Sequence, residues 1–174
     1  MWTSAVNLSH KTGSLIHLLF KAEDENTLYI SRHDVDEIFG SFSPHSFMLE
    51  EKDWPTVEHY FNAMKFTNSQ YQEKIQRAPT PAKAQKLGAN WLNRCFWQKQ
   101  PDWKNRQIVY MTRAIYSKCK QHSHIAEALL ATGDKRMVEN SQYDYYWGCG
   151  RDRRGQNKYG EVLMNVRDKL AEEA

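Results

Sequence analysis

The sequence lacks the features that mark membrane, secreted and disulfide-rich proteins. Its apolar runs, such as residues 18–20, fall far short of the ~20 residues that span a bilayer. Residues 1–4 show no basic segment followed by an apolar one, so we expect no secretory signal. The three cysteines, Cys95, Cys119 and Cys149, are an odd number without CxxC spacing, which argues against a disulfide framework or a zinc finger. We therefore expect a cytoplasmic protein, kept in a reducing compartment and away from membranes.

The chain also carries little net charge. The formal net charge is only +3, too small to indicate nucleic-acid binding by itself. The distribution is less even, because cations gather in residues 151–158 while Glu172 and Glu173 make the C-terminal end acidic. At 174 residues, with 40% hydrophobic side chains, the chain suits one domain that buries roughly 70% of its extended surface.

Aromatic side chains, by contrast, are plentiful, with six Trp, nine Tyr and seven Phe. Such rings can fill a core or stack on a planar ligand. Trp103 illustrates both alternatives: it follows Pro101 and Asp102 in the first turn of a predicted long helix. There its ring either stacks on a base or packs in the core.

The hydrophobic periodicity predicts one compact α+β domain, mostly helical with a small sheet. Residues 1–14 are polar and aperiodic, and we expect them to form a flexible N-terminal arm before a domain spanning residues 15–174. Helices are expected to begin at Thr56, at Asn68 or Ser69, at Thr80 followed by Pro81, at Asp102 and at Asn157. They are expected to end at Gly88 and at Gly133. Strands are expected at residues 15–20, 27–31, 47–49 and 135–140, with turns at residues 21–26 and 50–53.

The first candidate constellation lies in residues 54–66. Glu58, Asn62 and Lys65 are spaced i, i+4, i+7, so on a helix they share one face. A carboxylate, an amide and an amine in a row can line one pocket; the alternative is a solvated face with a weak Glu–Lys pair. His59 has no second His at a ligating distance along the chain, so we expect no metal site.

The second constellation is residues 144–150. Gly148 and Gly150 would let the backbone approach a ligand closely, with Asp144 and Trp147 at the rim. An acid beside a ring suits a sugar that carries a planar base. The alternative is an aromatic core cluster that precedes a turn.

The third constellation is the basic stretch Arg151, Arg154 and Lys158, with Gly155 and Asn157 at the predicted start of the last helix. Free backbone N–H groups, the positive end of the helix dipole and cationic side chains together predict a phosphate site. The alternative is a solvated basic loop. Neither a P-loop nor a GxGxxG fingerprint is present.

Three blocks taken together resemble the YbiA-like family of the NADAR (NAD- and ADP-ribose-associated) superfamily. They are residues 54–66 (WPTVEHYFNAMKF), residues 101–122 (PDWKNRQIVYMTRAIYSKCKQH) and residues 137–150 (MVENSQYDYYWGCG), the last continuing through GQNKYGEVLMNVRDKL. The resemblance spans roughly residues 41–170. It implies a small α+β fold and a hydrolase that cleaves N-glycosyl bonds with no metal or redox cofactor.

Members of this family hydrolyse the bond between a nitrogen and C1 of a ribose phosphate in early riboflavin-pathway intermediates. By this resemblance Glu58 and Asp144 are the carboxylates near C1, and Lys65 neutralises a phosphate or forms a Schiff base. Trp103 would stack on the base. Arg151, Arg154 and Lys158 are candidates for the phosphate by position only, whereas Gly155 and Asn157 match the family pattern.

Two other functions stay open at this point. Superfamily members that remove ADP-ribose from guanine would make ADP-ribosylated nucleic acid the partner, and a broad basic surface around the pocket would favour that reading. A non-catalytic sensor of ADP-ribose or NAD would keep the basic loop and the rings without needing Glu58. The modest net charge and the presence of both Glu58 and Asp144 favour a glycosidase acting on a phosphorylated ribosyl small molecule.

Overall fold

The computed structural model describes residues 25–89 and 99–174. The expected N-terminal arm (residues 1–14), the strand at residues 15–20 and Cys95 lie outside the described residues. The described part is an α+β fold with more helix than sheet, as the periodicity predicts. None of its helices is long and apolar enough to cross a membrane.

Two small sheets form, and both are two-stranded in the described part of the chain. Strand β1 (Thr27–Ile30) pairs in parallel with β4 (Arg136–Glu139), and β2 (Phe47–Leu49) pairs antiparallel with β3 (Lys52–Trp54). The expected turn at residues 50–53 is wrong in its second half. Only Glu50 and Glu51 make the turn, both at positive φ, as a tight two-residue hairpin requires.

The helices begin largely where the capping residues predict. Thr56 and Asn68 accept backbone N–H bonds at the starts of their helices, and Gly133 ends the α7 region at φ 54°. The described helices are α2 (Val57–Ala63), α3 (Ser69–Gln76), α4 (Pro81–Ala89), α6 (Trp103–Gln121), α7 (Ser123–Leu130) and α8 (Lys158–Glu172).

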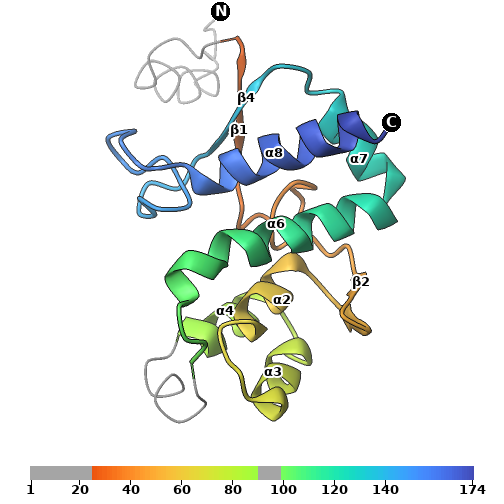
Figure 1. The fold of residues 1–174 in the computed structure, drawn as a ribbon. Coiled ribbons are helices and arrows are strands. Elements are labelled where there is room, and N and C mark those ends of the chain that lie inside the picture. The colour runs from red at the N-terminus through yellow and green to blue at the C-terminus, as the bar shows by residue number, and fades with distance from the viewer. Residues whose placement is uncertain (1–24, 90–98) are drawn as a thin grey trace, which may run out of the picture.

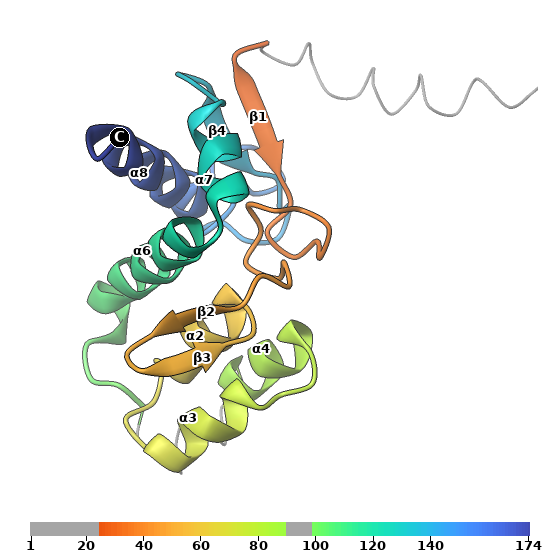
Figure 2. The same cartoon turned by 90° about the vertical axis from the view of Figure 1, so that its right-hand side faces the viewer.

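Helix α6 forms the middle layer of the molecule (Figures 1 and 2). On one side lie α8 and the β1–β4 sheet; on the other lie α2, α3, α4 and the β2–β3 hairpin. Its apolar stripe, with Met111, Ile115 and Cys119, is fully buried, as the helical spacing predicts. The buried face of α8 carries Val162 and Val166, so a single core runs through the layers.

Asn157 does not cap α8 in the predicted way. It precedes the helix in the left-handed region (φ 51°) and makes no side-chain capping bond. Its amide instead bonds the free edge of β4: Oδ1 accepts from the Glu139 backbone N–H at 2.8 Å, and Nδ2 donates to the Met137 carbonyl at 2.9 Å. Asp102 likewise precedes α6 in the left-handed region without a capping bond.

Gly88 does not end α4, as predicted from its position after Leu87, but lies within the helix. A Cβ on Gly88 would lie 2.2 Å from Oδ1 of Asn62 in α2. The glycine is therefore required by close packing of two helices, because no side chain fits between α4 and the Asn62 amide.

Replacing Asn157 by Ala should lower the free energy of unfolding by about 2–3 kcal/mol, because two buried backbone groups of β4 lose their partners. Urea denaturation measures the loss. The matched control is Asn165→Ala on the exposed side of α8, which should stay within about 0.5 kcal/mol of the wild type. Equal losses in both variants would contradict the edge-pairing role of Asn157.

The Gly88→Ala variant tests the α2–α4 packing, because the expected change in stability is opposite to the usual one. Alanine in a helix interior is ordinarily more stable than glycine by ~1 kcal/mol. Here overpacking against Asn62 should reverse that and destabilise the protein by about 1–3 kcal/mol. Thermal and urea unfolding check the sign, with the exposed Lys86→Ala on the same helix as control. A more stable Gly88→Ala protein would show that the α2–α4 contact is loose.

Candidate functional site

A chain of polar contacts runs along α2 in the interior. Ser41 Oγ donates to Glu58 Oε2 at 2.7 Å, and Glu58 Oε1 accepts from Asn62 Nδ2 at 2.8 Å. Asn62 Oδ1 then accepts from Lys65 Nζ at 2.6 Å. The predicted shared face is confirmed, but a solvated face is the wrong reading of it, since Glu58 is 1% exposed and Asn62 is fully buried.

The Glu58 carboxylate is stabilised as an anion. Burial raises its pKa, but the Arg32 guanidinium, the Ser41 hydroxyl, Lys65 and the Asn62 amide together outweigh burial, so its pKa lies below the ordinary value. Glu58 also occupies the first turn of α2, where the helix dipole favours a negative charge. The site therefore holds a buried, ionised carboxylate.

Lys118 of α6 positions the loop that carries Ser41. Its Nζ donates to the carbonyls of Ile38 (2.8 Å) and Gly40 (3.1 Å) and to Ser43 Oγ (3.0 Å). Burial lowers the Lys118 pKa to about 8. The sequence offered only its helical position as a signal, because its partners lie more than seventy residues away.

Arg32, two residues beyond the end of β1, is the residue that sequence reasoning missed most clearly. The residue is 4% exposed, and its guanidinium approaches Asp144 Oδ2 at 3.6 Å. Cζ lies 5.6 Å from the Trp147 ring and 5.7 Å from the Tyr159 ring, both cation–π distances. Within residues 25–89 and 99–174, its buried Nε has no hydrogen-bond partner. A lone Arg after a short strand carries no periodic signal that could have identified it.

Asp144 is the more accessible of the two predicted carboxylates, with 28% of its side chain exposed. Its Oδ1 accepts the backbone N–H groups of Tyr146 (3.0 Å) and Trp147 (2.7 Å), which fixes the loop that follows β4. Oδ2 faces Arg32 and keeps capacity to accept a further hydrogen bond.

Gly148 in the same loop is buried and pressed against Glu139. A Cβ on Gly148 would lie 2.1 Å from Glu139 Oε2, so this glycine serves close packing. Burial raises the pKa of the Glu139 carboxyl. The predicted approach of this backbone to a ligand stays a prediction; within the described residues the Gly148 backbone lies close to the Glu139 side chain of β4.

The predicted aromatic residues meet around Phe61. The Phe61 ring centroid lies 5.1 Å from that of Trp103 and 5.4 Å from that of Trp147, and Lys65 Nζ lies 5.0 Å from the Phe61 ring. Trp103 is 8% exposed and stacks on Tyr110 at 5.7 Å, so most of its ring belongs to the core. The structure thus gathers Lys65, Trp103 and Trp147 from three distant segments.

The expected phosphate site at the start of α8 does not form as predicted. The backbone N–H groups of Lys158 and Tyr159 donate to the carbonyls of Tyr146 (3.0 Å) and Trp147 (3.1 Å), so these amides are occupied. A Cβ on Gly155 would lie 2.2 Å from the Gly148 carbonyl oxygen, which shows how tightly the two loops pack.

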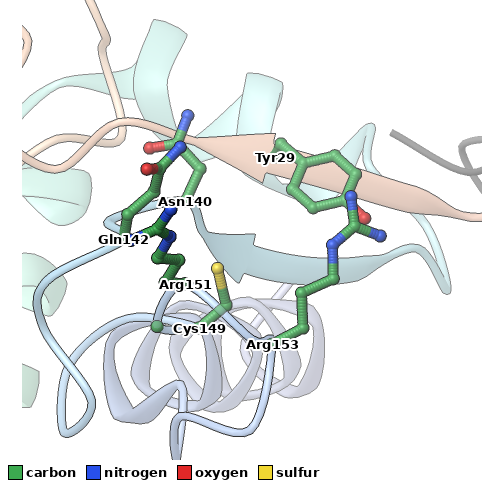
Figure 3. A pocket seen from close by; sticks show the side chains of 7 residues that line it. Tyr29, Asn140, Gln142, Cys149, Arg151 and Arg153 are labelled. Atoms are coloured by element: carbon green, nitrogen blue, oxygen red, sulfur yellow. The ribbon is translucent and has the colours of Figure 1, made fainter. Parts of the chain in front are cut away.

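The predicted basic side chains also separate. Lys158 pairs with Glu161 at 2.7 Å, and Arg154 is 87% exposed with its Nε 3.9 Å from Asp152. Arg151 and Arg153 line a pocket together with Tyr29 of β1 (Figure 3). The third constellation is therefore a set of surface cations that do not meet Glu58.

These positions define what the site can do chemically. Two carboxylates from distant segments, Glu58 and Asp144, lie around one buried guanidinium, and a primary amine sits beside an aromatic cluster. Fixed negative charge beside a flat apolar surface suits a reaction that develops positive charge on a sugar bearing a planar group.

Comparison with known proteins agrees with this chemistry. The NADAR domain family matches residues 19–171. N-glycosidase Npun_R5314 of Nostoc punctiforme is 40% identical over 136 residues, covering 76% of this chain and 84% of that protein. The riboflavin biosynthesis protein VVA0006 of Vibrio vulnificus is 36% identical over 151 residues, covering 86% of this chain and 40% of that protein.

The fold comparison points the same way. The NMR structure of the Escherichia coli protein YbiA superimposes with a TM-score of 0.73 at 30% identity, covering 88% of this chain and 93% of that one. The family match spans most of the chain, and the N-glycosidase relative is covered over most of its own length. The chain therefore belongs to the NADAR domain family, as a YbiA-like N-glycosidase that hydrolyses N-glycosyl bonds.

Proposed function

We propose that the enzyme hydrolyses the C1–N bond between a ribose 5-phosphate and a planar base, with ribosylamino-pyrimidine phosphates of early riboflavin biosynthesis as its substrates. The observation that carries the proposal is the position of Arg32. Its guanidinium contacts Asp144 and lowers the pKa of Glu58, so both carboxylates belong to one site. A relative named for riboflavin biosynthesis supports this substrate class.

Asp144 is the carboxylate assigned to the sugar. As the C1–N bond breaks, its electron pair leaves with the base nitrogen and C1 gains oxocarbenium character. The partly exposed Asp144 carboxylate stabilises that charge and accepts a proton from the water that adds to C1. The proton passes to the leaving nitrogen, so the products are the free amine and ribose 5-phosphate.

Glu58 is assigned a role without direct contact to the substrate. Both of its oxygens are bonded within the protein and it is 1% exposed, so it works through Asn62 to hold Lys65. Glu58 is thus a positioning residue in this proposal, and its negative charge adds to the field that stabilises the sugar cation.

Lys65 and the Phe61 cluster are assigned to the two ends of the substrate. Lys65 Nζ binds the phosphate, and Trp103 and Trp147 form the apolar wall that faces the base. A Schiff base between Lys65 and an opened C1 aldehyde is the competing role. Borohydride reduction during turnover distinguishes the two, because only the Schiff base leaves a stable adduct on the peptide that contains Lys65.

Removing either carboxylate charge should slow the reaction strongly. We expect Asp144→Asn and Glu58→Gln each to lower kcat by ~10²–10³, the range seen when one electrostatic group is lost. Mass spectrometry of the products from a ribosylamino-pyrimidine phosphate measures the rate. Glu73→Gln, an exposed acid on α3, is the matched control and should keep the wild-type rate.

Two outcomes would count against this assignment. Wild-type turnover in both carboxylate variants would remove Glu58 and Asp144 from the reaction. Release of ADP-ribose from ADP-ribosylated guanine DNA, with no product from the pyrimidine substrate, would replace the substrate class while keeping the bond type.

The Glu58 charge should also appear in the pH dependence of stability. Its pKa is lower in the folded than in the unfolded state, so its contribution is present above the unfolded pKa of ~4.3 and is lost as pH falls through the folded pKa. We expect the stability difference between wild type and Glu58→Gln to shrink on acidification. Urea unfolding of both proteins at neutral and acidic pH tests this; a constant difference would contradict it.

A further inference from the structure

Three histidines form a cluster where helix α6 meets α7. His45 lies in the segment before β2, His122 lies between α6 and α7, and His124 lies in the first turn of α7. The His45 ring centroid is 5.3 Å from that of His122 and 5.4 Å from that of His124, and the latter two are 5.9 Å apart. In the part of the chain that the structure describes, none of these rings pairs with a carboxylate.

The end of α6 holds the segment of residues 38–48, which contains His45. The His122 ring donates from Nε2 to the Ser46 carbonyl at 2.6 Å, since a carbonyl can only accept. Gln121 bonds both backbone groups of Met48, accepting from its N–H at 2.8 Å and donating to its carbonyl at 2.9 Å. These contacts fix the segment at the end that leads into β2.

His45 reaches the other end of the segment through Ser43. His45 Nδ1 lies 3.3 Å from Ser43 Oγ, which also accepts from Lys118 Nζ at 3.0 Å. Ser43 and Lys118 are each 1% exposed, so water does not screen this junction. The Lys118 ammonium also donates to the carbonyl of Gly40, the residue before Ser41. A continuous set of contacts therefore leads from the half-buried His45 ring to the loop that carries Ser41.

Ser41 joins that loop to the candidate site at several points. Its hydroxyl donates to Glu58 Oε2 at 2.7 Å, and its carbonyl accepts from the Glu58 N–H at 3.0 Å. Its own N–H donates to the Arg32 carbonyl at 3.0 Å. A shift of the loop would therefore disturb both Glu58 and Arg32, the opposite charges around which the site is built.

The charged groups that face His45 all oppose its protonation. Burial lowers the His45 pKa most, and Lys118, His122 and His124 lower it further. The Lys118 pKa is about 8, so its amine is charged below pH 7. A proton added to His45 on acidification therefore creates a second cation beside the ammonium, with only the Ser43 hydroxyl between them.

Three further titratable groups lie around this junction. Glu37 and Cys119 act on Lys118 and raise its pKa, against the larger effect of burial. The His33 ring meets the same loop from the side of Arg32, with its centroid 4.9 Å from that of Phe42. Titration of His33 would contribute equally to the wild type and to variants of His45, so a comparison between them isolates His45.

We propose that His45 is a positioning residue of the N-glycosidase site and that its protonation slows hydrolysis. The His45 cation repels the Lys118 ammonium across Ser43, the hold of Lys118 on the Gly40 carbonyl weakens, and Ser41 moves away from Glu58. Mild acid therefore slows the enzyme reversibly. The inference rests on the proposed function only for the part that Glu58 takes in the reaction.

The pH profile of kcat tests the role of His45. The variant is His45→Asn, whose amide can keep a contact with Ser43 but cannot gain a charge. Wild-type kcat should fall on the order of tenfold between about pH 7 and pH 5, as for one essential neutral imidazole, and in His45→Asn the fall should shrink to about twofold. Arg77→Gln, which removes an exposed cation at the end of α3, should keep the wild-type profile.

A second variant should act in the opposite direction. Because the charge of His124 lowers the His45 pKa, His124→Asn makes His45 easier to protonate. The fall of kcat should therefore move to higher pH in His124→Asn. A merely structural role of the cluster would not produce opposite shifts from two losses of an imidazole. Circular dichroism at each pH checks that the variants are folded.

A readout that needs no turnover separates this inference from the proposed function. The amide NMR signals of Ser41 and Glu58 should move as the wild type is acidified, and the movement should shrink at least about twofold in His45→Asn. If the wild type leaves a ribosylamino-pyrimidine phosphate intact, the proposed substrate fails, and a reduced amide shift in His45→Asn still supports the coupling.

Two results would overturn the inference. One is the same pH dependence, of kcat or of the two amide signals, in wild type and in folded His45→Asn. The other is a loss of kcat in His45→Asn that is equal at every pH, which would make His45 a residue of the fold alone.

Discussion

Burial of the Arg32 guanidinium constrains the rest of the structure. A charge removed from water costs several kcal/mol unless opposite charges and polarisable groups surround it. Here Asp144, the negative charge of Glu58 and the faces of two rings, Trp147 and Tyr159, provide that environment. These groups come from the segment after β1, α2, the loop after β4 and α8. The interaction that assembles the site therefore also joins the layers of the fold.

The polar chain on α2 explains several features that look purely structural. Asn62 bridges Glu58 and Lys65, and Gly88 allows α4 to pack closely against its amide. Lys118 in turn holds the loop whose Ser41 bonds Glu58. Packing and site geometry are thus the same set of contacts, so substitutions that loosen one should disturb the other.

Features that depend on short-range contacts could be predicted from the sequence. Thr56 and Asn68 cap helices through bonds three residues away, and the i, i+4, i+7 spacing put Glu58, Asn62 and Lys65 on one face. Burial of this face, by contrast, became evident from the packing of the helices around it. The tertiary structure also gave Gly88 and Asn157 roles that local patterns misread, and it placed Arg32 beside Asp144, where the Arg32 charge also lowers the pKa of Glu58. The physical reason is that these roles depend on partners from segments distant in the chain, and periodicity and capping rules carry no information about such partners.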